Sequence, residues 1–217
     1  MKNAICIYTK APIPGRTKSR LSLTIGDIPA AKLARAMLLD LCDEVSQIND
    51  LAFYVCYPPE NLLNEFIGII GDNVSLMAQV GNDLGERMTQ TFTQLLQLHQ
   101  NVIIIGSDCI THSTEHLIQA LDILNHKQIV IQPARDGGYV LIGQSTLITS
   151  VFKDIQWGEA TVYDDTLAGI HQFNHDVQIL DETFDIDVED DLEFLRLFLA
   201  QNSRKNTQDW FSQYSSG

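Results

Sequence analysis

The chain has 217 residues, a length that fits one domain or at most two. It carries 14 Lys and Arg against 28 Asp and Glu, for a formal net charge of −14. This negative excess argues against a general nucleic-acid or anionic-membrane surface, because phosphate groups require clustered cations. Residues 1–26, however, hold five bases and no acid, which predicts a local site for a small anion.

The sequence also bears on location. No apolar run approaches the roughly 20 residues that span a bilayer. The N-terminal segment has only a short apolar stretch and no small-residue cleavage site, which argues against a signal peptide. The four cysteines lie far apart without a CxxC pair, as expected in a reducing compartment. We therefore expect a cytoplasmic protein without a membrane span.

Short aliphatic runs alternate along the chain with segments of helical periodicity. The patterns predict strands at residues 3–8, 51–57, 74–78, 101–106, 128–132, 139–143 and 177–180. They predict helices at residues 28–48, 60–70, 83–99, 113–124, 160–173 and 189–200. Such alternation is typical of a mostly parallel sheet with helices on both faces. We expect a single α/β domain over residues 1–200 and a polar, loosely held tail over 201–217, in which Trp210 and Phe211 could dock.

A basic loop, KAPIPGRTKSR, follows the first predicted strand at residues 10–20. Two prolines stiffen the loop, and Gly15 allows its backbone to approach a ligand closely. Arg16, Lys18 and Arg20 supply cations that suit phosphate oxygens. The loop lacks the glycines of a Walker A or GxGxxG motif. It is therefore either a phosphate site or a solvated loop with scattered bases.

Carboxylates stand where other predicted strands end, and ligands of open α/β sheets bind at the carboxyl ends of strands. Asp108 directly follows the strand at 101–106, where it could hold Mg²⁺ or form a turn. Asp136 in ARDGGY is typical of a turn, which could face the same crevice. Asp185 and Asp187 alternate along an extended segment and should point the same way, which leaves a metal role open for both.

Several motifs occur together in one order along the chain. They are Lys10–Leu21, Asp83–Met88, Gly106–Cys109, Asp136–Gly143, Trp157–Gly158 and Asp185–Leu192. Together they resemble the bacterial radical-SAM/selenodomain-associated glycosyltransferase family of the nucleotide-diphospho-sugar transferase superfamily, and they are similar to 2-phospholactate guanylyltransferases. Ile110 stands where that family usually has proline, and Val188–Glu189 replace Thr-Pro. The resemblance implies a single-domain Rossmann-like three-layer α/β/α sandwich of GT-A type.

The resemblance further implies a metal-dependent transferase that uses a nucleotide-activated donor and a small-molecule acceptor. The donor would be a nucleotide-sugar in a glycosyltransferase. The alternatives are a nucleotidyltransferase that joins a nucleoside triphosphate to a small phosphorylated acceptor, and a nucleotide-binding module without turnover. An interaction protein that uses its acidic surface is a third alternative.

The same resemblance assigns roles to individual residues. Mg²⁺ or Mn²⁺ would be held by Asp108 and Asp187. The donor nucleotide would be bound by Lys10, Gly15, Arg16, Lys18 and Arg20. Catalysis would involve Asp108, Lys18 and Arg16. The acceptor side would contain Arg87, Asp136, Gly137 and Gly138.

Other residues have competing interpretations. Cys109, His112 and His116 have spacings that invite zinc or thiol chemistry, but they form no HExxH motif, and surface helix histidines explain the pattern better. Trp157 either stacks on a ligand or belongs to the core. Arg87 either contacts the acceptor or is a solvated residue of a helix's first turn.

Overall fold

In the computed structural model, which describes residues 2–61, 63–71 and 74–214, seven strands form one sheet. The strands are β1 (Asn3–Tyr8), β2 (Leu51–Tyr57), β3 (Ser75–Ala78), β4 (Val102–Gly106), β5 (Ile129–Pro133), β6 (Tyr139–Gln144) and β7 (Val177–Ile179). Their spatial order is β3-β2-β1-β4-β6-β5-β7. Strand β6 is antiparallel to β4 and β5, and the other pairs are parallel. The expected mostly parallel α/β sheet is confirmed.

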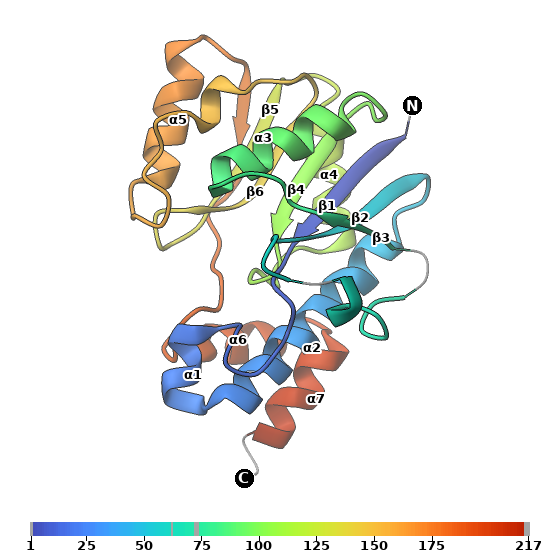
Figure 1. The fold of residues 1–217 in the computed structure, drawn as a ribbon, viewed down its shortest axis with the longest axis vertical. Helices are drawn as coiled ribbons and strands as arrows, with labels where there is room; N and C mark the ends of the chain where they lie inside the picture. Colours follow the sequence, from blue (N-terminus) through green and yellow to red (C-terminus); the bar gives the residue numbers. More distant parts are fainter. Residues whose placement is uncertain (1, 62, 72–73, 215–217) are drawn as a thin grey trace.

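Helices cover both faces of the sheet and one of its ends. They are α1 (Ser19–Ile25), α2 (Asp27–Ser46), α3 (Leu84–Leu95), α4 (Thr114–Ile123), α5 (Val162–Gln172), α6 (Asp191–Leu199) and α7 (Lys205–Tyr214). Helix α1, the N-terminal half of α2, α6 and α7 lie beyond the carboxyl ends of β1 and β4, and we call them the helical layer (Figure 1). Among the described residues, no helix has the length and apolar character needed to cross a membrane.

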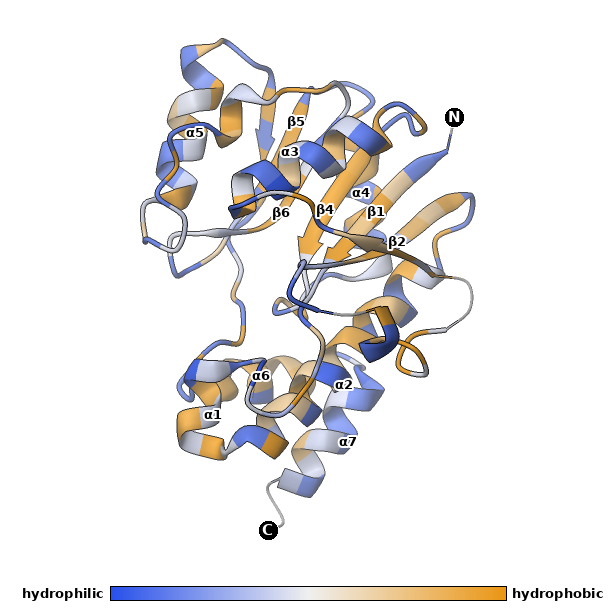
Figure 2. Cartoon of the chain, viewed as in Figure 1, coloured by the Kyte–Doolittle hydropathy of each residue, from blue (hydrophilic) through white to orange (hydrophobic). Residues whose placement is uncertain are grey.

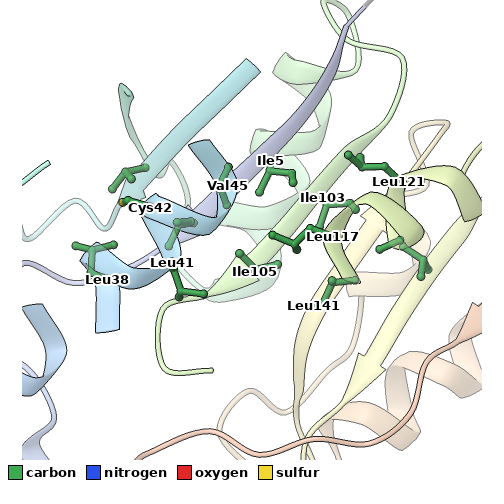
Figure 3. Close-up of a cluster of buried hydrophobic side chains, with 14 of the residues drawn as sticks. Ile5, Leu38, Leu41, Cys42, Val45, Ile103, Ile105, Leu117, Leu121 and Leu141 are labelled. Atoms are coloured by element: carbon green, nitrogen blue, oxygen red, sulfur yellow. The ribbon is translucent and has the colours of Figure 1, made fainter. Parts of the chain in front are cut away.

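Strand β4 shows why the sheet is buried on both faces. Ile103 and Ile105 point into a core shared with α2 and α4, whereas Val102 and Ile104 point into a core shared with α3 and α5. Because helices cover both sides, the strand carries apolar residues continuously rather than alternately. Figure 2 shows this apolar centre, and Figure 3 shows side chains of α2, among them Leu41, beside those of the strands.

Helix α3 begins as its capping pattern predicts. The Asp83 carboxylate accepts a hydrogen bond of 2.8 Å from the backbone N–H of Glu86. Gly85 in the first turn lets the helix approach Trp157, since a Cβ atom there would lie 2.7 Å from the indole ring. Trp157 packs against the core beneath α3 and α5, which supports the core interpretation of this residue. The helix ends at Leu95, four residues earlier than expected.

The helix predicted for residues 60–70 is wrong. The described part of this segment contains a single 3-10 turn, η1 (Leu63–Glu65), followed by further turns. Its apolar residues do not share a helical face: Phe66 is fully buried, whereas Ile67 is 70% exposed. Gly68, with φ of +79°, adopts a left-handed conformation that an α-helix does not contain.

The expectation of a loosely held tail does not hold for residues 205–214. They form α7, which packs along α2, and Trp210 is buried in the core of the helical layer. The indole N–H of Trp210 donates to the Pro29 carbonyl at 3.0 Å. The predicted docking of Trp210 is confirmed, and Phe211 packs against the same core. Helix α1 was not predicted either, because its seven residues follow directly on the proline-containing loop.

Candidate active site

A cavity of ≈ 460 Å³ lies where the carboxyl ends of β1 and β4 meet the helical layer. Its lining includes the end of β1 and the loop after it, the segments after β2, β3 and β4, the start of α1, the first turn of α3 and the segment before α6. The charged residues in this lining are Lys10, Lys18, Arg20, Arg87, Asp108 and Asp187. The structure therefore brings together predicted residues that lie up to 177 positions apart in the chain.

Lys18 occupies the centre of the charged group. Its side chain is 1% exposed, and its Nζ lies 2.5 Å from Oδ1 of Asp108 and 3.9 Å from Oδ1 of Asp187. The same ammonium donates to the carbonyl of Ile186. Burial of an ammonium is costly unless oxygen atoms surround it, and these three groups supply them. Lys18 thus ties the start of α1 to both segments that carry the predicted metal ligands.

Like charges crowd the acidic side of the site. Burial, followed by repulsion from Asp136 and Asp187, raises the pKa of Asp185 to about 7. Burial and repulsion from Asp108 also raise the pKa of Asp187, while Lys18 and Arg20 oppose the shift. A cation bound among these carboxylates would relieve the repulsion.

Arg87 lies with the cations of the first loop. Its guanidinium Nε donates to the Gly81 carbonyl at 3.2 Å, and its side chain is 21% exposed. The hydroxyl of Tyr8 donates to the backbone carbonyl of Arg87 at 3.1 Å, which joins α3 to the end of β1. Arg87 was predicted on the acceptor side, and the structure brings it into the same cavity as Lys10, Lys18 and Arg20.

Arg16 and Gly15 sit apart from this group. The Arg16 guanidinium pairs with Glu65 at 2.6 Å and donates to the Glu60 carbonyl at 2.9 Å. Gly15 has a φ of +77°, a left-handed conformation that favours glycine at the turn of the loop. Neither residue is among the described residues that line the cavity.

The turn formed by Asp136, Gly137 and Gly138 lies beside the carboxylates. Asp136 accepts a hydrogen bond of 2.9 Å from the Gly138 N–H. A Cβ atom on Gly137 would lie 2.0 Å from the Ala160 carbonyl oxygen, so only glycine fits against this segment. The turn is not part of the described cavity lining, but Asp136 is near enough to repel the charges of Asp185 and Asp187.

Some residues that border the cavity were not singled out in the sequence. Tyr8, Gln79 and Ser107 line it, and the Ile186 carbonyl binds Lys18. Their position at strand ends is a signal that could have identified Tyr8 and Ser107, because β1 and β4 are neighbours in the sheet. Gln79 directly follows β3, so the same signal applies to it, whereas Ile186 has no comparable signal because its role depends on the placement of a distant segment.

Two other hollows neighbour α3 and β3. One, of ≈ 480 Å³, shares Gln79 with the charged cavity and has an apolar lining that includes Tyr57, Pro59, Ala78 and Val80. The other is a groove of ≈ 890 Å³ between α3 and η2 (Ser150–Phe152), and Lys153 is the one cation among its described lining residues. The smaller hollow extends the charged cavity, whereas the larger one lacks its cluster of cations.

The Cys109, His112 and His116 group does not form a reactive site. Burial raises the pKa of the Cys109 thiol to about 11, so the thiolate nucleophile is disfavoured. His112 is fully buried, and its Nδ1 lies 3.4 Å from Nδ1 of His116. Within the described part of the chain, no three His, Cys, Asp or Glu side chains gather into a metal-binding group. The interpretation as surface helix histidines is wrong for His112, which precedes α4 and is fully buried, whereas His116 lies in the first turn of α4.

Comparison with known protein families shows which family the chain belongs to. A family model described as "Uncharacterized protein conserved in bacteria (DUF2064)" matches residues 41–159, just over half of the sequence. The chain belongs to this family. The part that matches DUF2064 includes the DLGERM and GSDC motifs and therefore contributes Arg87 and Asp108 to the cavity. A comparison with curated proteins finds no match.

Solved structures share the fold of this DUF2064 chain. A crystal structure from Desulfovibrio desulfuricans G20, provisionally named a nucleotide-diphospho-sugar transferase, is 31% identical, with a TM-score of 0.94 over 100% of this chain and 96% of that one. CMP:2-keto-3-deoxy-manno-octonic acid synthetase complexed with CTP is 9% identical, with a TM-score of 0.60 over 93% and 99%. Rv0371c from Mycobacterium tuberculosis H37Rv in complex with manganese is 13% identical, with a TM-score of 0.54 over 90% and 98%.

The comparisons confirm the predicted fold of nucleotide-diphospho-sugar transferase type. The structure of about one-third identity covers the full chain, whereas the two at lower identity show the shared fold alone. The narrower radical-SAM-associated family remains a prediction.

Proposed function

We propose that the chain is a metal-dependent transferase that uses a nucleotide-activated donor. The observation that carries this proposal is the gathering of two cavity-lining carboxylates, Asp108 and Asp187, with the cations of the first loop and α3. This cavity lies at the carboxyl ends of strands, where open α/β sheets bind their ligands. The provisional name of the Desulfovibrio structure, and the CTP bound to a protein of the same fold, support a nucleotide as the donor.

The cations would bind the donor phosphates. Arg20 and Arg87 present planar forks that match phosphate oxygens, and Lys10 and Lys18 act as point charges. Gly15 and Arg16 would contact the phosphates from the outer part of the loop. For Arg16 this requires that the guanidinium leave Glu65, so its contribution should be smaller than that of Lys18 or Arg20.

The apolar hollow that shares Gln79 would take the flat ring of the nucleobase. Tyr57, Pro59 and Val80 supply an apolar surface beside the charged cavity. A base and its phosphates require this combination of an apolar wall and a nearby group of cations. The acceptor would enter from the side of Asp136, Gly137 and Gly138, next to Asp185.

The residues of the site fit a divalent metal ion. Mg²⁺ is usually held by one or two carboxylates and completes its shell with substrate phosphates and water. Asp108 and Asp187 have side chains that are 48% and 40% exposed, and both line the cavity that would receive the phosphates. Burial raises the pKa of Asp187 most and repulsion from Asp108 raises it further, and this repulsion supplies a further reason for a cation there. When held by Asp108 and Asp187, Mg²⁺ or Mn²⁺ would supply Lewis-acid chemistry that offsets the negative charge of the phosphates.

The chain needs no covalent intermediate for this chemistry. The buried Cys109 thiol stays protonated, and the acceptor's own oxygen would attack the donor. Asp108 would hold the metal, while Lys18, assisted by Arg20 and Arg16, would stabilise the negative charge that develops on the leaving phosphate. Binding the two substrates in one orientation would supply much of the remaining rate acceleration.

A nucleotidyltransferase is the second candidate function. In the first candidate, the donor is a nucleotide-sugar and the acceptor bonds to the sugar carbon. In the second, the donor is a nucleoside triphosphate, the acceptor bonds to phosphorus, and pyrophosphate leaves. The concentration of Lys10, Lys18, Arg20 and Arg87 in one cavity favours the second, because a triphosphate carries more negative charge.

The test is a screen of nucleotide-sugars and nucleoside triphosphates with Mg²⁺ or Mn²⁺. Thermal melting would report binding, and release of nucleoside diphosphate or of pyrophosphate would distinguish the two reactions. We expect Asp108→Asn and Asp187→Asn each to lower turnover by about 100-fold or more, because each removes a metal ligand at the reacting phosphates. Asp122→Asn removes one exposed negative charge on α4 and should leave turnover unchanged.

Two results would count against the proposal. If neither nucleotides nor divalent metals shift the melting temperature, both candidate functions fail. If a nucleotide binds but Asp108→Asn and Asp187→Asn retain the metal dependence of the parent protein, the assignment of the metal ligands is wrong. Binding without turnover of any donor would indicate a nucleotide-binding module.

A further inference from the structure

The ammonium of Lys18 lies between the two carboxylates that the proposed function assigns to a metal ion. Its Nζ is 2.5 Å from Asp108 and 3.9 Å from Asp187, and it also donates to the Ile186 carbonyl. With 1% of the side chain exposed, the ammonium depends on these oxygens rather than on water. Lys18 therefore acts as a cation that belongs to the chain and neutralises the carboxylates.

The backbone directs Lys18 to this place. Lys18 directly precedes α1 and has φ of 49° and ψ of 44°, a left-handed conformation that is uncommon for a residue with a side chain. The neighbouring Leu21 and Ile25 are buried in the core of the helical layer and hold α1 in position. Because Lys18 lines the charged cavity, its side chain can turn from the carboxylates into the space proposed for the phosphates.

A divalent ion and the ammonium cannot share this position. An ion bound by Asp108 and Asp187 would lie close to the present place of Nζ, since that atom lies 2.5 Å from Oδ1 of Asp108 and 3.9 Å from Oδ1 of Asp187. Two cations so close together repel each other strongly. A lysine side chain, whose four-carbon stem is flexible, can relieve this repulsion by moving to a phosphate.

We infer that Lys18 is an exchangeable counter-cation, which leaves Asp108 and Asp187 when the metal binds and then pairs with a phosphate of the donor. This inference rests on the proposed function. It predicts that metal and donor bind with positive coupling, because the phosphates provide new partners for the displaced ammonium. The protein alone should bind divalent metals weakly.

The first experiment measures Mn²⁺ binding in the absence of nucleotide, from the electron paramagnetic resonance signal of the free ion. Lys18→Met removes the competing charge and should tighten Mn²⁺ binding by about tenfold or more, the equivalent of one hydrogen bond between charged groups. Lys10→Met is the matched control, because it removes the same charge from the exposed rim of the same cavity. It should change Mn²⁺ affinity much less.

The opposite sign would overturn the inference. If Lys18 instead holds Asp108 in place for the metal, Lys18→Met will bind Mn²⁺ no more tightly than the parent protein, or more weakly. Lys18→Gln, which is uncharged but polar, provides a second variant should the methionine protein fail to fold. Thermal melting of each variant establishes that it is folded.

A second measurement uses the unaltered chain. Brief acetylation of lysine amines, followed by mass spectrometry, should label the buried Lys18 severalfold faster at saturating Mn²⁺, while the labelling of exposed Lys10 stays constant. Labelling of Lys18 that is unchanged or slower with Mn²⁺ contradicts the exchange.

The two proposals fail in different ways. If the parent protein binds Mn²⁺ with a nucleotide but Lys18 shows neither the affinity gain nor the labelling gain, the exchange fails and the proposed function stands. If Mn²⁺ binds no variant, with or without nucleoside triphosphates, the exchange and the metal dependence fail together.

Discussion

The sheet and the helical layer are held by different kinds of contact. The strands meet α2, α3, α4 and α5 through aliphatic and aromatic side chains, many of them fully buried. The helical layer has its own apolar core, but buried charged groups also join it to the rest of the chain. Lys18 pairs with Asp108 after β4, and Arg204 pairs with Glu44 while donating to the carbonyls of Ile110 and His112.

The two kinds of contact therefore have different effects: one stabilises the sheet, and the other fixes the orientation of the helical layer. Apolar burial is strong but non-directional, so it stabilises the sheet without defining a unique angle to the helical layer. Buried ion pairs add little net stability because both charges lose their water, yet they require a particular geometry and are costly when one partner is missing. The candidate active site lies at the junction of the two regions, where Lys18 from one meets Asp108 from the other.

The largest loss of stability is expected from a substitution in the apolar core of the sheet. Ile105 is fully buried at the centre of the sheet, so Ile105→Ala should lower the free energy of unfolding by about 2–5 kcal/mol through lost burial and a residual cavity. Urea unfolding followed by circular dichroism would measure it. Leu23 in the helical layer is 86% exposed, and Leu23→Ala should change stability by less than about 0.5 kcal/mol. Equal losses of stability at Ile105 and Leu23 would contradict the role of apolar burial in holding the sheet.

A smaller effect is expected where a buried carboxylate holds α7. Asp40 is 3% exposed and accepts hydrogen bonds of 2.9 and 2.8 Å from the N–H groups of Asn206 and Thr207. Asp40→Ala leaves these donors without their partner and should cost about 1–3 kcal/mol. Detachment of α7 would also expose Trp210 and shift its fluorescence to longer wavelength.

Lys205→Ala is the control for Asp40→Ala on the same helix. It removes an exposed ion pair with Asp209 and should leave stability almost unchanged, because water screens such a pair. If Asp40→Ala is as mild as this control, the buried polar contacts do not hold the helical layer.

The third effect appears only in acid. Burial, together with the neighbouring His116, lowers the pKa of His112 to about 3, whereas the unfolded chain protonates this side chain near its ordinary value of about 6.5. Between these values the unfolded state binds one more proton, so stability is complete above about pH 6.5 and falls by about 1.4 kcal/mol per pH unit below it.

His112→Gln should make this slope shallower while retaining a polar group, and burial also lowers the pKa of His116, which contributes the remainder. Urea unfolding at pH 6.5 and pH 5 would compare the two proteins. An acid slope that is the same in both would show that His112 does not titrate on unfolding. His112 lies at the junction of the two regions, because its backbone carbonyl accepts a hydrogen bond from Arg204. A loss of stability in acid would therefore begin at this junction.

The strands were predictable because their physics is local. Continuous aliphatic runs such as residues 101–106 indicate strands covered on both faces, and the cap at Asp83 is a short-range pattern. The helix predicted at residues 60–70 was wrong because the prediction rested on the apolar residues of this segment. Gly68 favours a turn there, and Ile67 is exposed rather than packed on a helical face. Helix α7 was missed because its sequence is mostly polar, and its few buried residues gain their partner only when α2 is in place.

The candidate site also has features that the sequence predicted and features that it did not. The basic loop and the aspartates at strand ends could be recognised from composition and position, and the excess of bases over acids in residues 1–26 indicated the loop. The ion pair of Arg16 with Glu65 joins residues 49 positions apart, and no local pattern reports it. The same holds for Arg87, whose place beside the first-loop cations depends on the packing of α3 against the end of β1.

By itself, the sequence determined the α/β class, the strands and the residue types that could bind a phosphorylated ligand, because these follow from periodicity, composition and short-range spacing. Only the tertiary structure decided that Lys18 lies buried between Asp108 and Asp187 and that Arg16 turns toward Glu65. Contacts between distant segments depend on how whole elements pack, and a charged side chain takes whichever buried or exposed partner that packing brings within reach.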